Sequence, residues 1–189
     1  HLIARAALEV HHYFIPPDKA AEEVSRLRKA MAAVHEELTT LRTTLPDDAP
    51  EEMAAFLDVH SMILHDEMLT RAPENLICQR HYNAEWALAT QLEELVGQFD
   101  EIADPYLRER KADVVQVVER VLNMLAAGEG TAPMPVQAVT DTPLVVVAHD
   151  ISPADMLQFK HHTFVGFVTE LGGKNSHTAI MARSLDIPA

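Results

Sequence analysis

The chain has 189 residues, of which 48% are hydrophobic and only 5% aromatic. Its formal net charge of −14 argues against a nucleic-acid surface, which needs clustered Lys and Arg, and is compatible with a basic protein partner or simply with solubility. The single cysteine, Cys78, excludes an internal disulfide, and no apolar run approaches the ~20 residues of a membrane-spanning helix.

Residues 16–130 are expected to form an antiparallel four-helix bundle. Asp18 is expected to be the N-cap of the first helix, whose apolar residues recur at spacings of three and four up to a turn-rich linker at 43–50. The other helices are expected over residues 50–72, from Asn75 or Asn83 to 103, and over 105–126. Pro50 and Pro105 fit the first turns of their helices, and the glycines at 128–130 end the last one.

After residue 130 the pattern changes to that of an α/β domain. An irregular linker leads to an apolar, β-branched run at 144–150, which is typical of a buried strand, and residues 164–170 predict a second strand. Between them, residues 152–159 predict a helical turn with Ser152 as its cap. The order of strand, helix, strand, loop and helix is typical of α/β folds.

The loop GGKNS, residues 172–176, leads directly into a helix that begins near His177. Such a junction offers unpaired backbone N–H groups and the positive end of a helix dipole, which favour anions such as phosphate. A histidine there can bind a phosphate, can carry one as a nucleophile, or can be an ordinary residue near a helix cap. Donors for a phosphoryl group are expected from four nearby residues: Gly173, Ser176, Thr178 and Arg183.

The stretch GGKNSHTAIMARSLDIPA closely resembles the active-site signature of Enzyme I of the bacterial phosphoenolpyruvate:sugar phosphotransferase system. FLDVHSMILHDEML and DPYLRERKADV resemble helices of the same family. The sequence departs from the family at Asn175, where threonine is usual. Met156 stands where some relatives have a threonine that hydrogen-bonds the active imidazole. A methionine side chain cannot donate that bond, so we do not assign this role to Met156.

The resemblance implies that Nε2 of His177 takes a phosphoryl group from phosphoenolpyruvate and passes it to the phosphocarrier protein HPr. It implies a swivelling phosphohistidine α/β domain made of residues 1–15 and 131–189, with the helical bundle of residues 16–130 inserted into it. Both ends of the chain look cut, so we expect a truncated domain from a longer enzyme. The resemblance implies that the whole enzyme is a homodimer, and we expect it to be cytoplasmic.

The family's C-terminal barrel, which binds phosphoenolpyruvate and Mg²⁺, is not expected within these residues. The chain alone is therefore expected to be a monomer that holds no cofactor or metal and cannot autophosphorylate.

The resemblance also implies a site on the bundle where HPr docks, an apolar patch ringed by acidic residues. Met62, Ile63, Asp66 and Leu69 are expected to share one helix face. Alternatively, Met62 and Leu69 belong to the core of the bundle. The matching positions are Glu51, Glu52, His60, Met62, Ile63, Asp66, Glu67, Leu69, Phe99 and Arg110.

Other functions remain open on the sequence alone. One is the phosphohistidine domain of a dikinase-type enzyme or phosphoenolpyruvate synthase, against which the helical insertion and the SHTAI stretch argue. Another is a non-catalytic helical adaptor with an anion-binding loop. A metal site among the histidines is disfavoured, because no cysteine cluster or HExxH pattern accompanies them. The sequence does not distinguish a sugar-transport from a nitrogen-regulatory parent.

Overall fold

The structure, a computed structural model, describes residues 10–45, 49, 51–103, 105–127, 144–148 and 164–169. The chain divides into two compact units. The helical unit comprises Leu8–Thr40 and Asp58–Pro133, and the second unit comprises His1–Ala7, Leu41–Leu57 and Met134–Ala189. The described residues form five α-helices, one short 3-10 helix and two strands, so the chain is mostly helical, as the sequence predicted.

The first long helix, α1, spans Ala20–Thr43 and follows a 3-10 turn, η1, at Pro17–Lys19. The expectation that Asp18 is the N-cap of α1 was wrong, because Asp18 lies inside η1. Pro17 sets up the tight turn, which is closed by a 2.9 Å hydrogen bond from the Lys19 N–H to the Pro16 carbonyl. The predicted end of the helix near residue 43 is confirmed.

The helix expected over residues 50–72 is in fact two helices, α2 (Glu51–Leu64) and α3 (Glu67–Arg80). Between them the chain turns, and the Asp66 N–H donates to the Ile63 carbonyl at 3.1 Å. The Asp66 carboxylate then accepts the Met68 N–H at 2.8 Å, which makes Asp66 the N-cap of α3. This cap stabilises a break that the apolar periodicity alone did not reveal.

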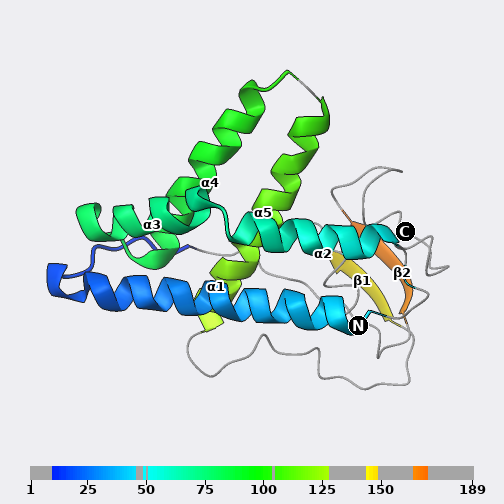
Figure 1. The fold of residues 1–189 in the computed structure, drawn as a ribbon, viewed down its shortest axis with the longest axis horizontal. Coiled ribbons are helices and arrows are strands. Elements are labelled where there is room, and N and C mark those ends of the chain that lie inside the picture. The colour runs from blue at the N-terminus through cyan, green and yellow to red at the C-terminus, as the bar shows by residue number, and fades with distance from the viewer. Residues whose placement is uncertain are drawn as a thin grey trace. The chain divides into compact units, whose positions relative to one another are not determined.

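Helix α4 spans Ala84–Glu101 and α5 spans Pro105–Ala127, so the start near Asn83 and the helix after Asp104 are confirmed. The two pack together as an antiparallel hairpin. Figure 1 shows α5 running across α1 rather than along it. With α2 and α3 separate, the described helices number five, not the four that the sequence suggested.

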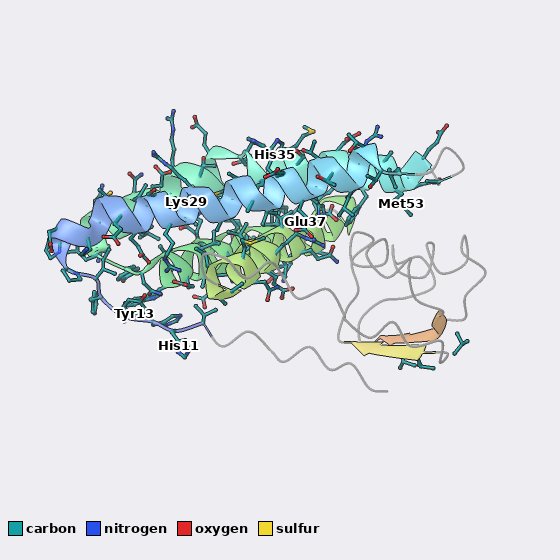
Figure 2. The ribbon with its side chains drawn as sticks, turned by 90° about the horizontal axis from the view of Figure 1, so that it is seen from below. His11, Tyr13, Lys29, His35, Glu37 and Met53 are labelled. Carbon is teal, nitrogen blue, oxygen red and sulfur yellow. The ribbon has the colours of Figure 1, made fainter. Side chains whose placement is uncertain are left out.

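An extended segment before α1 is fastened to the start of α4. Phe14 and Tyr82 form an isolated antiparallel bridge, and the Asn83 N–H donates to the Tyr13 carbonyl at 3.1 Å. The buried Asn83 side chain accepts from the Tyr13 N–H and donates to the His11 carbonyl. Figure 2 shows His11 and Tyr13 on this segment, beside the helices.

The core of the helical unit is aliphatic and draws on every helix. On α1 the buried residues recur at spacings of three and four, as the sequence predicted. None of the helices in the described ranges is both long and apolar enough to cross a membrane. The buried core residues include Leu27, Val34, Leu38, Leu64, Leu69, Ile77, Leu88, Val117, Val118 and Val121.

In the second unit, strands β1 (Leu144–Ala148) and β2 (Phe164–Thr169) pair in parallel. Both predicted strands are therefore confirmed, and parallel pairing is typical of α/β folds. The expectation that the first strand is buried was wrong for Val145, whose side chain is exposed, and Val165 and Val168 of β2 are exposed as well. In the described part of the chain the sheet has two strands, and such a pair leaves side chains uncovered. The helical turn expected at 152–159 lies outside the described residues.

Candidate functional site

The residues expected to carry the phosphoryl group lie outside the described residues. They are Gly173, Ser176, His177, Thr178 and Arg183, and their chemistry stays a prediction from the sequence. Met156 and Asn175, where the sequence departs from the family, also lie outside the described residues. The described part of the candidate site is the partner-binding surface expected on the helical unit.

The turn between α2 and α3 exposes an apolar and acidic surface, here named the turn surface. It consists of Met62, Ile63, Asp66, Glu67 and Met68. Met62 is 74% exposed and Met68 is 40% exposed, which is unusual for such large apolar side chains. Asp66 and Glu67 are also exposed. Flexible methionines next to carboxylates suit a partner with an apolar patch and basic charge.

The capping of α3 by Asp66 fixes the geometry of the turn surface. His65 adds a further restraint, because its Nδ1 lies 2.7 Å from the Ser61 carbonyl. A carbonyl oxygen only accepts hydrogen bonds, so this nitrogen is the protonated donor. The His65 ring also meets the His35 ring edge to face, with 4.6 Å between the ring centroids. Contacts on both sides of the turn therefore restrain it.

The other predicted partner residues divide into exposed and buried groups. Glu51 and Glu52 are exposed in the first turn of α2, while Phe99 and Arg110 are partly exposed. His60 and Leu69 are 1% and 2% exposed, so the expectation that they contribute directly to a partner surface does not fit this structure.

The shared helix face expected for Met62, Ile63, Asp66 and Leu69 does not exist, because the helix breaks at Asp66. Of the two residues that had a core alternative, Leu69 is buried in the core and Met62 is not.

His60 belongs to a buried polar line that joins α2 to α5. Its Nε2 lies 3.7 Å from Oδ1 of Asp113, which is 3% exposed. The other oxygen, Oδ2, accepts a 3.1 Å hydrogen bond from Nη1 of Arg110. The side chain of Arg110 is 40% exposed, so the line begins in the interior and ends at the surface.

Two residues of this region were missed by the sequence reasoning. Met68 was hidden by the continuous helix expected over 50–72, and the motif of Asp66 followed by Glu67 was the signal of a new helix start. Asp113 was overlooked although it stands three residues after Arg110, a spacing that places both on one helix face. Among the described residues, no group of three or more His, Cys, Asp or Glu side chains could hold a metal ion.

Comparisons with known proteins agree with the fold and the motif. Residues 2–110 match the family model of the N-terminal region of PEP-utilising enzymes, and residues 140–189 match that of their mobile domain. The chain belongs to the PEP-utilising enzyme family.

Among curated relatives, the phosphoenolpyruvate-protein phosphotransferase of Cupriavidus necator is 61% identical over the whole chain, which covers 33% of that protein. The enzyme of the same name from Listeria innocua is 41% identical over 88% of the chain, which covers 28% of that protein. The chain thus spans about a third of the length of the curated relatives it matches.

Two solved structures share the fold. An NMR solution structure of Enzyme I has a TM-score of 0.75 and 29% identity, and the match covers 96% of this chain and 72% of that one. The structure described as the N-terminal domain of Enzyme 1 – Nitrogen has a TM-score of 0.70 and 27% identity, and the match covers 99% of this chain and 75% of that one.

Proposed function

We propose that the chain is the histidine-bearing, carrier-docking part of a phosphoenolpyruvate-protein phosphotransferase. The observation that carries the proposal is the coincidence of the GGKNSH motif with the match to the mobile domain of PEP-utilising enzymes. In the proposed reaction His177 receives a phosphoryl group that comes from phosphoenolpyruvate and passes it to HPr. The 61% identity with a relative that has this activity in its name supports the proposal.

The chemistry at His177 is an in-line displacement at phosphorus. The lone pair of a neutral Nε2 forms the N–P bond while the bond from phosphorus to the donor's oxygen or nitrogen breaks, and transfer to HPr reverses this step. Little covalent help is needed from other groups, so positioning and charge stabilisation carry the catalysis. We assign that stabilisation to the Gly173 N–H, to the hydroxyls of Ser176 and Thr178, and to Arg183.

We propose that HPr docks on the turn surface of the helical unit. Its exposed methionines supply apolar area, and Asp66 and Glu67 supply negative charge, in a chain with a net charge of −14. Opposite charges on HPr would speed encounter and orient the complex. Glu51, Glu52, Phe99 and Arg110 are the remaining proposed contacts.

The finer fold assignment also belongs to this proposal. We assign residues 1–15 and 131–189 to a phosphohistidine α/β domain and residues 16–130 to a helical insertion. The parallel pairing of β1 with β2 supports an α/β arrangement. We propose that Mg²⁺ and phosphoenolpyruvate bind to a barrel outside this chain. We also propose that the whole enzyme is a cytoplasmic homodimer that acts in sugar uptake.

The test is phosphoryl transfer from phosphorylated HPr to this chain. The expected result is acid-labile label on the wild type and on His162→Ala, with none on His177→Ala. Because His162→Ala also removes one imidazole, it separates the loss of any histidine from the loss of the acceptor. Wild type that binds HPr but takes no label would contradict the carrier role. Incubation with phosphoenolpyruvate and Mg²⁺ alone is expected to give no label.

A further inference from the structure

The polar line from His60 through Asp113 to Arg110 contains ionisable side chains at places where apolar ones would suffice for packing. A carboxylate that is 3% exposed lies between an imidazole of α2 and a guanidinium of α5. Burying a carboxylate costs free energy unless it is paired and hydrogen-bonded, so the hydrogen bond from Arg110 helps to stabilise Asp113. The buried carboxylate is thus hydrogen-bonded to an arginine, Arg110, whose side chain is 40% exposed.

A second arginine of α5 shows what a purely structural pair looks like in this fold. Nη1 of Arg120 donates to Oε1 of Glu37 on α1 at 2.6 Å, and the two side chains are only 12% and 19% exposed. That pair joins α5 to α1 and leaves little of the guanidinium for another molecule. Arg110 differs, because Asp113 lies three residues away on the same helix and the pair joins no other helix by itself.

We propose that Asp113 is a positioning residue that holds the guanidinium of Arg110 in the orientation in which it donates to an oxygen acceptor on docked HPr. Arginine recognises oxygen acceptors through a rigid, planar fork, so fixing one edge of the fork directs the rest. His60 faces the other carboxylate oxygen, with 3.7 Å between Nε2 and Oδ1, so it lies behind Asp113 on the buried side. The inference rests on the proposed function.

This assignment also accounts for His60. The resemblance placed His60 among the partner-binding residues, yet it is 1% exposed. It lies two residues before Met62 on α2, on the buried side of the same helix turn. Acting through Asp113 and Arg110, a buried imidazole can influence docking without touching HPr.

The experiment is a double-mutant cycle on HPr binding, measured by calorimetry with this chain. Asp113→Asn keeps the shape of the side chain and removes its charge, and Arg110→Gln removes the donor fork. Each single variant is expected to weaken binding roughly tenfold, the effect of losing one charge-assisted hydrogen bond. In the Arg110→Gln background, Asp113→Asn is expected to cause no further loss.

Glu37→Gln is the matched control, because it removes another acid paired with an arginine of α5. The affinity of this variant for HPr is expected to equal that of wild type.

The outcomes separate the inference from the proposed function. No binding of HPr by the wild-type chain overturns the proposed function and the partner role of Arg110 together. If wild type binds, unchanged binding by Asp113→Asn, or a loss that persists in the Arg110→Gln background, overturns the positioning role alone.

Arg110→Lys keeps the test open should Asp113→Asn fail to fold, because the side chain of Arg110 is 40% exposed. A loss as large as that of Arg110→Gln supports an oriented fork, and wild-type affinity overturns it. In parallel, NMR of the Arg110 Nε–Hε group is expected to show an ordered signal in wild type that averages toward the free-arginine position in Asp113→Asn. An unchanged signal contradicts the inference.

Discussion

Two regions of the helical unit use their side chains in opposite ways. The charged seam between α1 and α4, made of Glu23, Arg26, Asn83 and Glu85, turns its polar groups toward one another. Arg26 donates to Glu85 at 2.7 Å and to Glu23 at 2.7 Å. The turn surface instead leaves Met62 74% exposed. Polar groups satisfied within the fold indicate a structural role, whereas large apolar groups left in solvent indicate a surface for another molecule.

The seam also completes the start of α4. The Glu23 carboxylate accepts the Ala84 N–H at 2.7 Å, so a side chain of α1 performs the capping that Asn83 does not. Burial alone raises the pKa of the Glu85 carboxyl, but hydrogen bonds from Arg26 and Asn83 outweigh burial, and the pKa lies below its ordinary value. The hydrogen bond with Glu85 raises the pKa of Arg26 further above its ordinary value.

The largest effect on stability is expected in the buried core of the helical unit. Leu88 on α4 is fully buried, so Leu88→Ala is expected to lower the free energy of unfolding by about 2–5 kcal/mol through lost burial and a residual cavity. Met62→Ala, which removes a similar apolar volume from the turn surface, is the control and is expected to change it by less than about 0.5 kcal/mol. Urea unfolding followed by circular dichroism measures both. Equal losses would remove the distinction between core and turn surface.

The next effect is expected in the charged seam. Arg26→Met removes the guanidinium and leaves Glu23 and Glu85, whose side chains are 12% and 15% exposed, without their shared donor. The expected loss of unfolding free energy is about 2–3 kcal/mol, in the range of hydrogen bonds that involve charged groups. Chemical denaturation of this variant checks the value. A change below about 0.5 kcal/mol would mean that water replaces the arginine at no cost.

A smaller effect is expected when the turn surface is altered. Met62→Asp places a charge where the proposed HPr contact is apolar, and binding is expected to weaken about tenfold, which corresponds to about 1.4 kcal/mol. Because Met62 makes little contact with its own chain, the unfolding free energy is expected to stay the same. Calorimetric titration with HPr and a denaturation curve test the two halves of this prediction. Lost stability with retained binding would reverse the roles assigned to the two regions.

Acidification is expected to remove part of the seam's contribution. The folded-state pKa of Glu85 lies below the ordinary value of 4.5, so its ionised form stabilises the fold above that pH, and the contribution disappears as the pH falls through the folded-state pKa. Wild type is therefore expected to be more stable than Glu85→Gln near pH 7, by about 1 kcal/mol, and the difference is expected to shrink toward about pH 3. Unfolding of both proteins across this range measures the difference. A difference in unfolding free energy that grows as the pH falls would contradict this prediction.

The sequence predicted features that depend on local chemistry and missed those that depend on distant partners. The apolar spacing on α1, the proline at the start of α5 and the β-branched runs of β1 and β2 gave correct elements. The break at Asp66 also had a local signal, a capping residue followed by an acid, but it was outweighed by continuous helical periodicity.

Burial of His60 had no such local signal. It depends on Asp113, which is 53 residues later in the chain (113 − 60), and on the packing of α2 against α5. The contact of Glu23 with the start of α4 joins residues 61 apart in the same way. The predicted chemistry of His177 rests on motif alone, because it lies outside the described residues.

The smallest effect is expected at the pair between Arg28 on α1 and Glu74 on α3. Its geometry is as good as that of the seam, with two hydrogen bonds of 2.6 Å, and the bond from Arg28 holds the pKa of Glu74 below its ordinary value. The side chain of Arg28, however, is 66% exposed, so water and salt screen the attraction. A double-mutant cycle of Arg28→Ala and Glu74→Ala is expected to give a coupling smaller than that of the seam, and one that falls further in salt. A coupling as large as that of the seam would show that bidentate geometry, rather than burial, decides what an ion pair contributes in this fold.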